Sequence, residues 1–219
     1  MGLAKRVLFG VGLWPYRLKQ MSEEFIILRS TARRYPARPY SCINALSLAS
    51  FGEWAFEPKL NGWRCVIDME NKVVVSRHGT TFAETGRIMD IARAVPELAG
   101  FRLIDCEFLG KRTKAGKGSV VIMDIMDSPL PYSERMSLIS GFAECPLDDI
   151  PTNALMRFPS YTQAKAQQVL EDMKEINARR GEVIWEGFVA KHPNSTYPLQ
   201  LSPSAECRFW AKAKLINGS

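Results

Sequence analysis

The chain has 219 residues, of which 46% are hydrophobic, 10% aromatic and 24% charged. This composition is that of an ordinary globular protein and excludes a disordered, collagenous or membrane-spanning chain. The length fits either one large domain or one domain with a short appendage. The five cysteines are odd in number and form no C-x-x-C pair, which predicts buried thiols in a reducing compartment. With only two histidines, a zinc site is not expected.

The formal net charge of +6 is concentrated at the beginning of the chain. Residues 1–50 contain eight Lys and Arg side chains against two Glu, whereas residues 51–219 are neutral overall. We interpret residues 1–50 as a basic arm packed on a domain formed by residues 51–219. Clustered cations favour a polyanionic partner, because binding releases phosphate counterions. A solvated basic face that keeps the protein soluble is the alternative interpretation.

The first residues do not have the features of a signal peptide. The apolar stretch 7–14 is short, contains two glycines and runs into Pro15 without a small-residue cleavage site. We therefore expect a cytoplasmic or nucleoid-associated protein with no membrane partner.

Short apolar runs separated by turns dominate the chain after residue 53. Within the first 50 residues, which are broken by prolines, only 23–28 looks regular. Apolar runs predict strands over 54–57, ending at Pro58, and over 64–69, 73–76, 102–109, 119–126, 183–190 and 208–215. Helical spacing predicts helices over 84–94, 133–143 and 162–180, the last stopped by Gly181. Paired strands with irregularly placed helices predict an α+β fold with largely antiparallel sheets flanked by helices.

The segment EPKLNGWR, residues 57–64, carries the strongest chemical signal. It places Lys59 in a turn between two apolar runs, where Gly62 permits tight backbone geometry. A lysine at such a position can act as a nucleophile. The tetrapeptide K-x-N-G alone is weak support, because most such segments are plain turns. Trp63 and Trp210 are predicted to be core anchors rather than base-stacking platforms.

Six segments, in order, resemble motifs of the covalent nucleotidyltransferases, the family of ATP-dependent DNA ligases, RNA ligases and mRNA capping enzymes. Residues 59–64 resemble K-x-D-G-x-R, with Asn61 in place of the acid; 76–79 resemble S-R-x-G, and 105–107 resemble D-G-E. Residues 121–139 are similar to an F-D-I/V strand followed by a P-L-x-E-R-R helix. Residues 186–197 resemble E-G-V-V-A-K with a trailing S-P-Y, and 210–214 resemble W-L-K-x-K.

The resemblance implies an ATP-grasp-like adenylation domain whose sheets form a nucleotide cleft. It implies that Lys59 is the catalytic nucleophile, which attacks the α-phosphorus of ATP, releases pyrophosphate and carries AMP as a phosphoramidate. Glu57 would read the adenine, and Lys212 and Lys214 would hold the α-phosphate. The side chains implied to bind the nucleotide are Glu57, Arg64, Arg77, Glu107, Met123, Lys191, Lys212 and Lys214.

Glu107 and Glu186 are implied to hold Mg²⁺ or Mn²⁺, since hard cations prefer carboxylate oxygens. Taken alone, both acids could instead be exposed strand-end residues, and the two lysines of 212–214 could be the wet face of a strand. Two positions depart from the family. Asn61 keeps the size of aspartate but not its charge, which predicts slower adenylation. Met123 stands where an aromatic ring stacks on adenine, which predicts weaker adenine binding.

The context of the motifs is closer to ATP-dependent DNA ligases than to capping enzymes. We expect an enzyme that moves AMP to a DNA 5′-phosphate and seals nicks, as in DNA replication, repair or recombination. The expected partner is nicked duplex DNA and the expected state is a monomer. The sequence ends five residues after Lys214, so no OB-fold is expected, and the basic residues 1–50, an accessory protein or a clamp acting in trans would replace it. The alternatives are an RNA ligase without an OB-fold and a degenerate, non-catalytic module that binds nucleotides or DNA ends.

Overall fold

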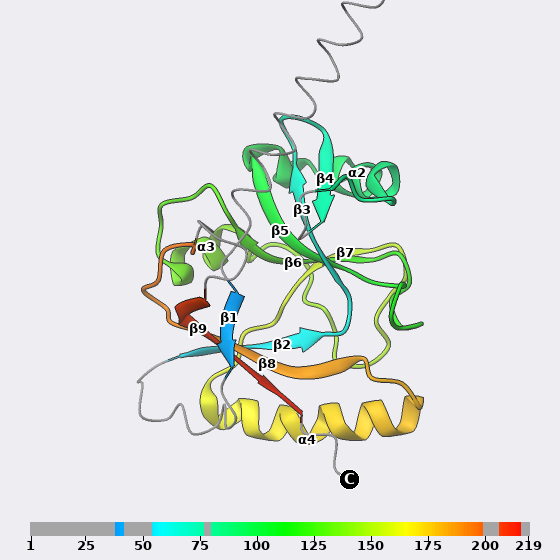
Figure 1. The fold of residues 1–219 in the computed structure, drawn as a ribbon, viewed down its shortest axis with the longest axis vertical. Coiled ribbons are helices and arrows are strands. Elements are labelled where there is room, and N and C mark those ends of the chain that lie inside the picture. The colour runs from blue at the N-terminus through cyan, green and yellow to red at the C-terminus, as the bar shows by residue number, and fades with distance from the viewer. Residues whose placement is uncertain (1–37, 42–53, 77–79, 199–205, 216–219) are drawn as a thin grey trace, which may run out of the picture.

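The computed structural model describes residues 38–41, 54–76, 80–198 and 206–215. Within these ranges the chain forms two sheets, three α-helices and one 3₁₀ helix (Figure 1). Most of the expected basic arm, the predicted regular segment 23–28 and Arg77 lie outside the described residues. The mixed α+β class with mainly antiparallel strands is confirmed.

The first sheet has four strands and carries α4 (Gln163–Arg180) along one face (Figure 1). Their spatial order is β1 (Arg38–Ser41), β9 (Glu206–Lys214), β8 (Trp185–Lys191) and β2 (Ala55–Leu60). The pairs β2–β8 and β8–β9 are antiparallel, whereas β1 runs parallel to β9.

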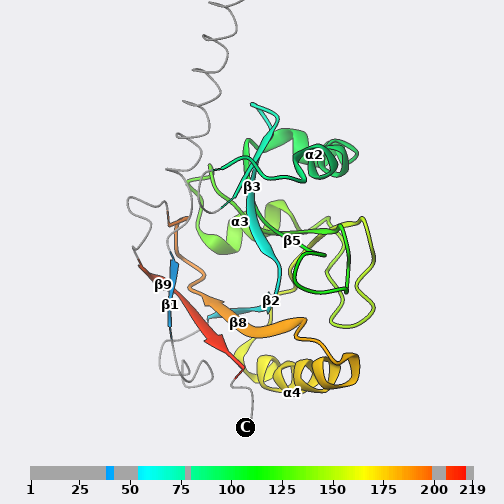
Figure 2. The same cartoon turned by 45° about the vertical axis from the view of Figure 1, so that its right-hand side comes forward.

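The second sheet has five strands and is covered by α2 (Thr85–Arg93) and the 3₁₀ helix η2 (Pro96–Gly100). Its spatial order is β4 (Val73–Ser76), β3 (Trp63–Asp68), β5 (Leu103–Phe108), β6 (Val120–Ile125) and β7 (Leu155–Arg157). The helix α3 (Tyr132–Leu138) follows β6. The turn at Asn61 and Gly62 carries the chain from the first sheet to the second, where β2 leads into β3 (Figure 2).

Alternation along the strands gives the first sheet one apolar and one charged face. Phe56, Phe188 and Ala190 pack with the buried stripe of α4 in one core cluster. On β2, the residues that alternate with Phe56 are Glu57 and Lys59, and their side chains belong to the opposite face. The amphipathic pattern of the strands therefore sends the charged side chains away from α4.

The second sheet turns its own polar face toward that charged face. Cys65, Ile104 and Cys106 pack with α2 and η2 in a second core cluster, and the intervening residues on β3 and β5 point the other way. A third, smaller cluster contains Val66 from this sheet and Trp210 from β9, so it joins the two inner faces. The two sheets thus meet through faces that mix apolar and charged side chains.

The predicted end of the first strand at Pro58 is wrong, because β2 continues to Leu60. The amide of Phe56 donates to the carbonyl of Tyr161 on the side away from β8. Pro58, two residues later, faces the same way, and β2 is an edge strand, so the missing N–H interrupts no ladder. Lys59 consequently lies in a paired strand and not in a turn.

Other boundaries also differ from the prediction. The strands β1 and β7 were not predicted, and β1 forms within the segment expected to be irregular, with Pro39 on an edge strand. The helix α3 ends at Leu138 instead of residue 143. The hydroxyls of Ser137 and Ser140 donate to the carbonyls of Ser133 and Ser137, which competes with the continued helix.

Two further expectations concern cysteines and membranes. Four of the five cysteines lie in the described part of the chain, and all four are buried free thiols, as predicted. In the same part of the chain, no helix combines the length and the hydropathy needed to cross a membrane.

Candidate active site

Strand register brings Lys59 and Lys214 together across the first sheet. Lys59 of β2 pairs with Gly187 of β8, and Gly187 pairs with Lys214 of β9. Lys59 Nζ lies 2.6 Å from Glu186 Oε2, and Lys214 Nζ lies 3.8 Å from the same oxygen. Gly187 lets the two strands pair this closely, because a Cβ there would clash with the carbonyl oxygen of Ala213 in β9. One carboxylate therefore lies between two amines on the inner face of the sheet, and the Lys59 side chain remains 27% exposed.

The turn after Lys59 is fixed by Asn61 and Gly62. The Asn61 side-chain amide donates to the carbonyl of Val183 at 2.9 Å, and its backbone amide donates to the carbonyl of Ile184. A Cβ at Gly62 would lie 2.6 Å from Glu107 Cγ and 2.8 Å from the carbonyl oxygen of Phe108. Asparagine thus has a local role that aspartate lacks, since only its NH₂ group can donate to a carbonyl. The turn is held against Glu107 of β5.

The two predicted metal-binding carboxylates have different protonation behaviour. Burial raises the pKa of Glu107 to about 7, although the charges of Lys59 and Arg64 oppose the shift. Partial burial also disfavours ionised Glu186, but the hydrogen bond from Lys59 and the charges of Lys59 and Lys214 outweigh it and lower the pKa. Near neutral pH, Glu186 is therefore ionised while Glu107 is close to its midpoint.

The elevated pKa of Glu107 predicts a stability that falls as pH rises. The folded protein binds this proton more tightly than the unfolded chain, whose ordinary pKa is 4.5, so the loss occurs between about pH 4.5 and 7. Above that window the ionised group costs up to about 3 kcal/mol. We expect Glu107→Gln to be more stable than the parent at pH 8 and nearly equal to it at pH 5 in urea denaturation. The exposed acid Glu97 is the matched control, because Glu97→Gln should follow the parent profile. Parallel profiles for Glu107→Gln and the parent would refute the assignment.

A second polar cluster, fully buried, surrounds Lys191 of β8. Its Nζ lies 2.8 Å from Glu57 Oε2 and donates to the carbonyl of Met123 at 2.9 Å. The Tyr132 hydroxyl donates to the other oxygen of Glu57 at 2.5 Å. Burial raises the pKa of Glu57, and the charge of Lys191 works against that shift. Lys191 Nζ also lies 4.5 Å from the centre of the Trp210 ring, a cation–π distance.

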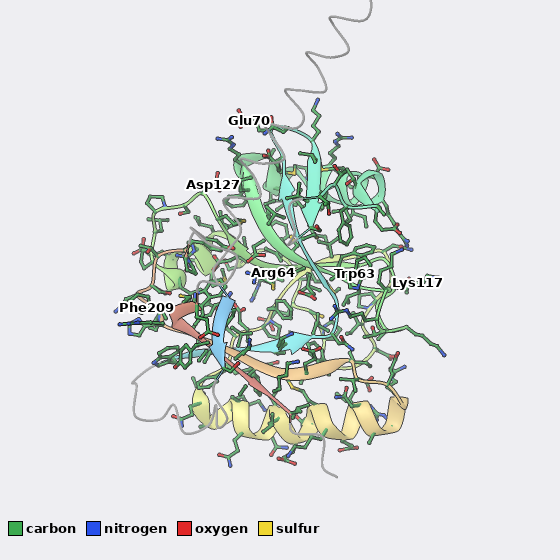
Figure 3. All side chains as sticks on the ribbon, in the orientation of Figure 1. Trp63, Arg64, Glu70, Lys117, Asp127 and Phe209 are labelled. Atoms are coloured by element: carbon green, nitrogen blue, oxygen red, sulfur yellow. The ribbon has the colours of Figure 1, made fainter. Side chains whose placement is uncertain are left out.

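Two bidentate ion pairs lie beside these clusters. Arg135 of α3 donates to both oxygens of Asp124, at 2.7 and 3.0 Å, and both side chains are fully buried. Arg64 of β3 donates to both oxygens of Asp105, at 2.9 and 2.5 Å, and lies between the two sheets near the centre of the molecule (Figure 3). Such forked contacts fix the orientation of the guanidinium group as well as its position.

The structure brings most of the predicted site residues onto the facing inner surfaces of the two sheets. Lys59, Glu186 and Lys214 form one group, which also acts electrostatically on Glu107. The register places Lys212 in the same row as Glu57, through Val189. Sequence reasoning did not assign roles to five side chains that hold the site together, although each lies within or beside a matched motif: Asp105, Asp124, Tyr132, Arg135 and Tyr197.

The residues present fit a hard divalent cation. No group of three or more His, Cys, Asp and Glu side chains suited to a metal occurs in the described ranges. Mg²⁺, however, keeps several waters and takes phosphate oxygens, so one or two carboxylates complete its protein ligands. Glu107 and Glu186 supply two such carboxylates, and the charge of Glu186 contributes to the raised pKa of Glu107.

The fold matches solved structures, although the sequence matches no protein-family model and no curated protein. A Lig E DNA ligase aligns with 82% of this chain at a TM-score of 0.51 and 14% identity, over 68% of its own length. An archaeal ATP-dependent RNA ligase aligns with 82% at 0.53 and 18%, over 48% of its length. The Chlorella virus DNA ligase-adenylate aligns with 83% at 0.52 and 14%, over 67% of its length.

The chain has the fold of polynucleotide ligases. The match confirms the resemblance that the six motifs indicated, and it covers 82–83% of this chain. This chain spans between about half and two thirds of the length of those ligases.

Proposed function

We propose that this chain is the adenylation part of an ATP-dependent polynucleotide ligase, with Lys59 as its catalytic nucleophile. The observation that carries the proposal is the group formed by Lys59, Glu186 and Lys214 on one sheet face, next to Glu107. A partly exposed lysine, with one carboxylate in contact that can accept its proton and a second cation beside that carboxylate, suits the transfer of a negatively charged group to nitrogen. The ATP-grasp-like nucleotide cleft would lie between the inner faces of the two sheets.

In the first step the Lys59 amine attacks the α-phosphorus of ATP. The Nζ–P bond forms while the bond from phosphorus to the pyrophosphate oxygen breaks, and the amine loses its proton. Glu186 Oε2, which lies 2.6 Å from Lys59 Nζ, would take that proton. Lys212 and Lys214 supply positive charge where the transferred phosphoryl group carries negative charge. A divalent cation, Mg²⁺ or Mn²⁺, on Glu107 and Glu186 would supply further neutralisation of the phosphates.

Recognition of the adenine would fall to the buried cluster around Glu57. Both of its oxygens already have partners, Tyr132 and Lys191. Each carboxylate oxygen has a second lone pair, so Glu57 can still accept a hydrogen bond from the adenine amino group. Met123, whose carbonyl holds Lys191, would pack its thioether on the ring.

The direct test is incubation with α-labelled ATP and Mg²⁺ or Mn²⁺, followed by denaturing electrophoresis. The protein should retain the label with ATP and not with GTP, because Glu57 would accept a hydrogen bond from the amino group of adenine, which guanine lacks at that position. A degenerate module that only binds nucleotides or DNA ends would carry no covalent label under any metal condition, and this result would contradict the proposal.

The choice between DNA and RNA is a separate question, since solved ligases of both kinds share the fold. We propose DNA as the substrate, on the resemblance of the motifs, and RNA as the second candidate. The labelled enzyme should be chased with a nicked DNA duplex and with the same nick carrying RNA on its 3′-hydroxyl side. Faster sealing of the all-DNA nick supports a DNA ligase. Faster sealing of the RNA-containing nick supports an RNA ligase.

We also propose that the basic arm supplies contacts to the polynucleotide, as its excess of cations suggests. The strand β1 belongs to the first sheet, so a deletion that tests the arm should end before Arg38. Deleting residues 1–36 should weaken binding of nicked DNA and flatten its salt dependence, and unchanged binding would remove this part of the proposal.

A further inference from the structure

The loop between β5 and β6 concentrates positive charge within residues 51–219, which are neutral overall. Residues 111–118, KRTKAGKG, hold four cations and no acid, and all four cations are exposed. Lys111 forms an ion pair with Glu84, and Glu182 accepts a hydrogen bond from the backbone amide of Lys114. Arg87, from α2, adds a fifth exposed cation beside Gly118. The five cations therefore outnumber the two acids, Glu84 and Glu182, that bond to the loop.

Hydrogen bonds and glycines hold this loop in one conformation. The amide of Leu109 donates to the carbonyl of Ser119, and the amide of Gly118 donates back to Leu109, so the loop is closed at its base. Gly110, Gly116 and Gly118 have positive φ values of 103°, 59° and 83°. A Cβ at Gly116 would lie 2.5 Å from the Ile150 side chain. The loop is thus packed against the body of the protein, and its lysines project from a fixed support, as Lys117 does in Figure 3.

An exposed tryptophan adjoins the cations. The prediction that Trp63 is a core anchor is wrong: 41% of it is exposed, whereas Trp210 is buried as predicted. The Trp63 ring contacts Phe82 at a centroid distance of 5.8 Å, and Phe82 is two residues from Glu84, the partner of Lys111. Trp63 also pairs with Phe108, where β5 enters the loop. The aromatic ring therefore lies at the base of the cationic loop, beside the end of β5 that leads into it.

This surface borders the candidate active site. Only Asn61 and Gly62 with Leu60 separate Trp63 from Lys59 along the chain. On the other side, the charge of Arg112 acts on Glu186, the carboxylate that holds Lys59. The Trp63 ring itself packs on Phe82 on the α2 side of the second sheet, so the surface and the nucleophile lie on either side of the turn at Asn61 and Gly62.

We propose that the surface formed by Trp63, Arg87, Lys111, Arg112, Lys114 and Lys117 binds a polynucleotide strand, with phosphates on the cations and a base stacked on Trp63. Cations that follow a backbone, combined with an exposed aromatic ring, are the chemistry by which proteins hold nucleic-acid strands without reading their sequence. The proposal rests on the proposed function, because a polynucleotide ligase must bind a strand near its active site. Its test measures binding and needs no catalysis.

The test measures binding of the full chain to a fluorescent nicked duplex, in DNA and in RNA form, by anisotropy without ATP over a range of salt concentrations. The variant Lys114→Gln/Lys117→Gln is compared with Lys165→Gln/Lys174→Gln, which removes the same charge from the exposed face of α4. Losing two phosphate contacts should make the plot of log affinity against log salt shallower by about 1.4 to 1.8, and weaken binding at least about tenfold at 0.1 M salt. The α4 variant should keep the parent slope. Equal slopes for the two variants would overturn the proposal.

Trp63 is tested separately with Trp63→Ala and Trp63→Phe, each checked for an unchanged thermal transition. Loss of one stacked base should weaken binding by about five-fold to a hundred-fold, and phenylalanine should restore most of it. Binding by Trp63→Ala at the parent affinity would remove the stacking role. Self-labelling with ATP is measured in parallel. A parent protein that does not label itself would count against the proposed function alone, because the salt slopes test strand binding independently of labelling.

Discussion

Replacing Lys191 by methionine is expected to lower the free energy of unfolding by about 3–5 kcal/mol. Lys191 Nζ is the cation between Glu57 and Asp124, at 2.8 and 3.7 Å, and all three side chains are buried. Methionine keeps the length and packing of the stem but removes the charge. Glu57 would then be left without its cation in a site where burial already raises its pKa. Breaking one partner of a buried pair costs far more than removing both.

The measurement is urea denaturation at pH 7, with two comparison variants. Glu57→Gln/Lys191→Met removes both charges and should recover part of the loss. Lys165→Met, on the exposed face of α4, should change stability by less than about 0.5 kcal/mol. If Lys191→Met costs no more than Lys165→Met, the buried cluster does not have the energetics that its geometry indicates.

Replacing Gly187 by alanine is expected to disrupt the register that aligns Lys59 with Lys214. The Gly187 φ is +131°, and a Cβ there would lie 2.1 Å from the carbonyl oxygen of Ala213 in β9. Since that atom belongs to the backbone, the strands themselves must separate. Strain and overpacking together should cost about 3 kcal/mol or more. Any shift of β9 moves Lys214 relative to Lys59, so labelling with ATP should fall at least about tenfold, because phosphoryl transfer depends on position.

Two other glycines separate the causes of that effect. Gly181 also has a positive φ, 64°, but its Cβ would meet no atom within 4 Å, so Gly181→Ala reports backbone strain alone. Gly141 has open space and no such φ, so Gly141→Ala should be neutral. Denaturation and labelling should rank the losses Gly187 first, Gly181 second and Gly141 last. A Gly187→Ala variant with the stability and labelling of Gly141→Ala would contradict the role given to Gly187 in aligning Lys59 with Lys214.

Local signals predicted the elements whose ends are set by neighbouring residues. The helix predicted over 162–180 differs from α4 by one residue, because Thr162 caps its first turn and Gly181 ends it in the left-handed conformation. The extent of β2 was mispredicted because the tolerance for Pro58 depends on its being an edge strand, which is a property of the sheet. The three-residue strand β7 exists through its pairing with β6 and has no periodicity of its own.

The candidate site shows the same division between local and long-range information. The order of the motifs predicted that Lys59, Glu186 and Lys214 belong to one site. Only the pairing of β2, β8 and β9 brings both lysines to the same oxygen of Glu186. Asp124 and Arg135 lie within a matched segment, yet their bidentate contact depends on how α3 returns to β6. Side chains that support other side chains leave no spacing in the sequence, since their partners are set by packing.

The most direct measurement of the central claim is identification of the residue that carries AMP. The protein is incubated with ATP and Mg²⁺, digested, and the adenylylated peptide is sequenced by mass spectrometry, in parallel for the parent, Lys59→Ala and the surface control Lys165→Ala. We predict that AMP is found on Lys59 in the parent and in Lys165→Ala, and that Lys59→Ala carries none. AMP on any other residue, or retained by Lys59→Ala, would show that Lys59 is not the nucleophile.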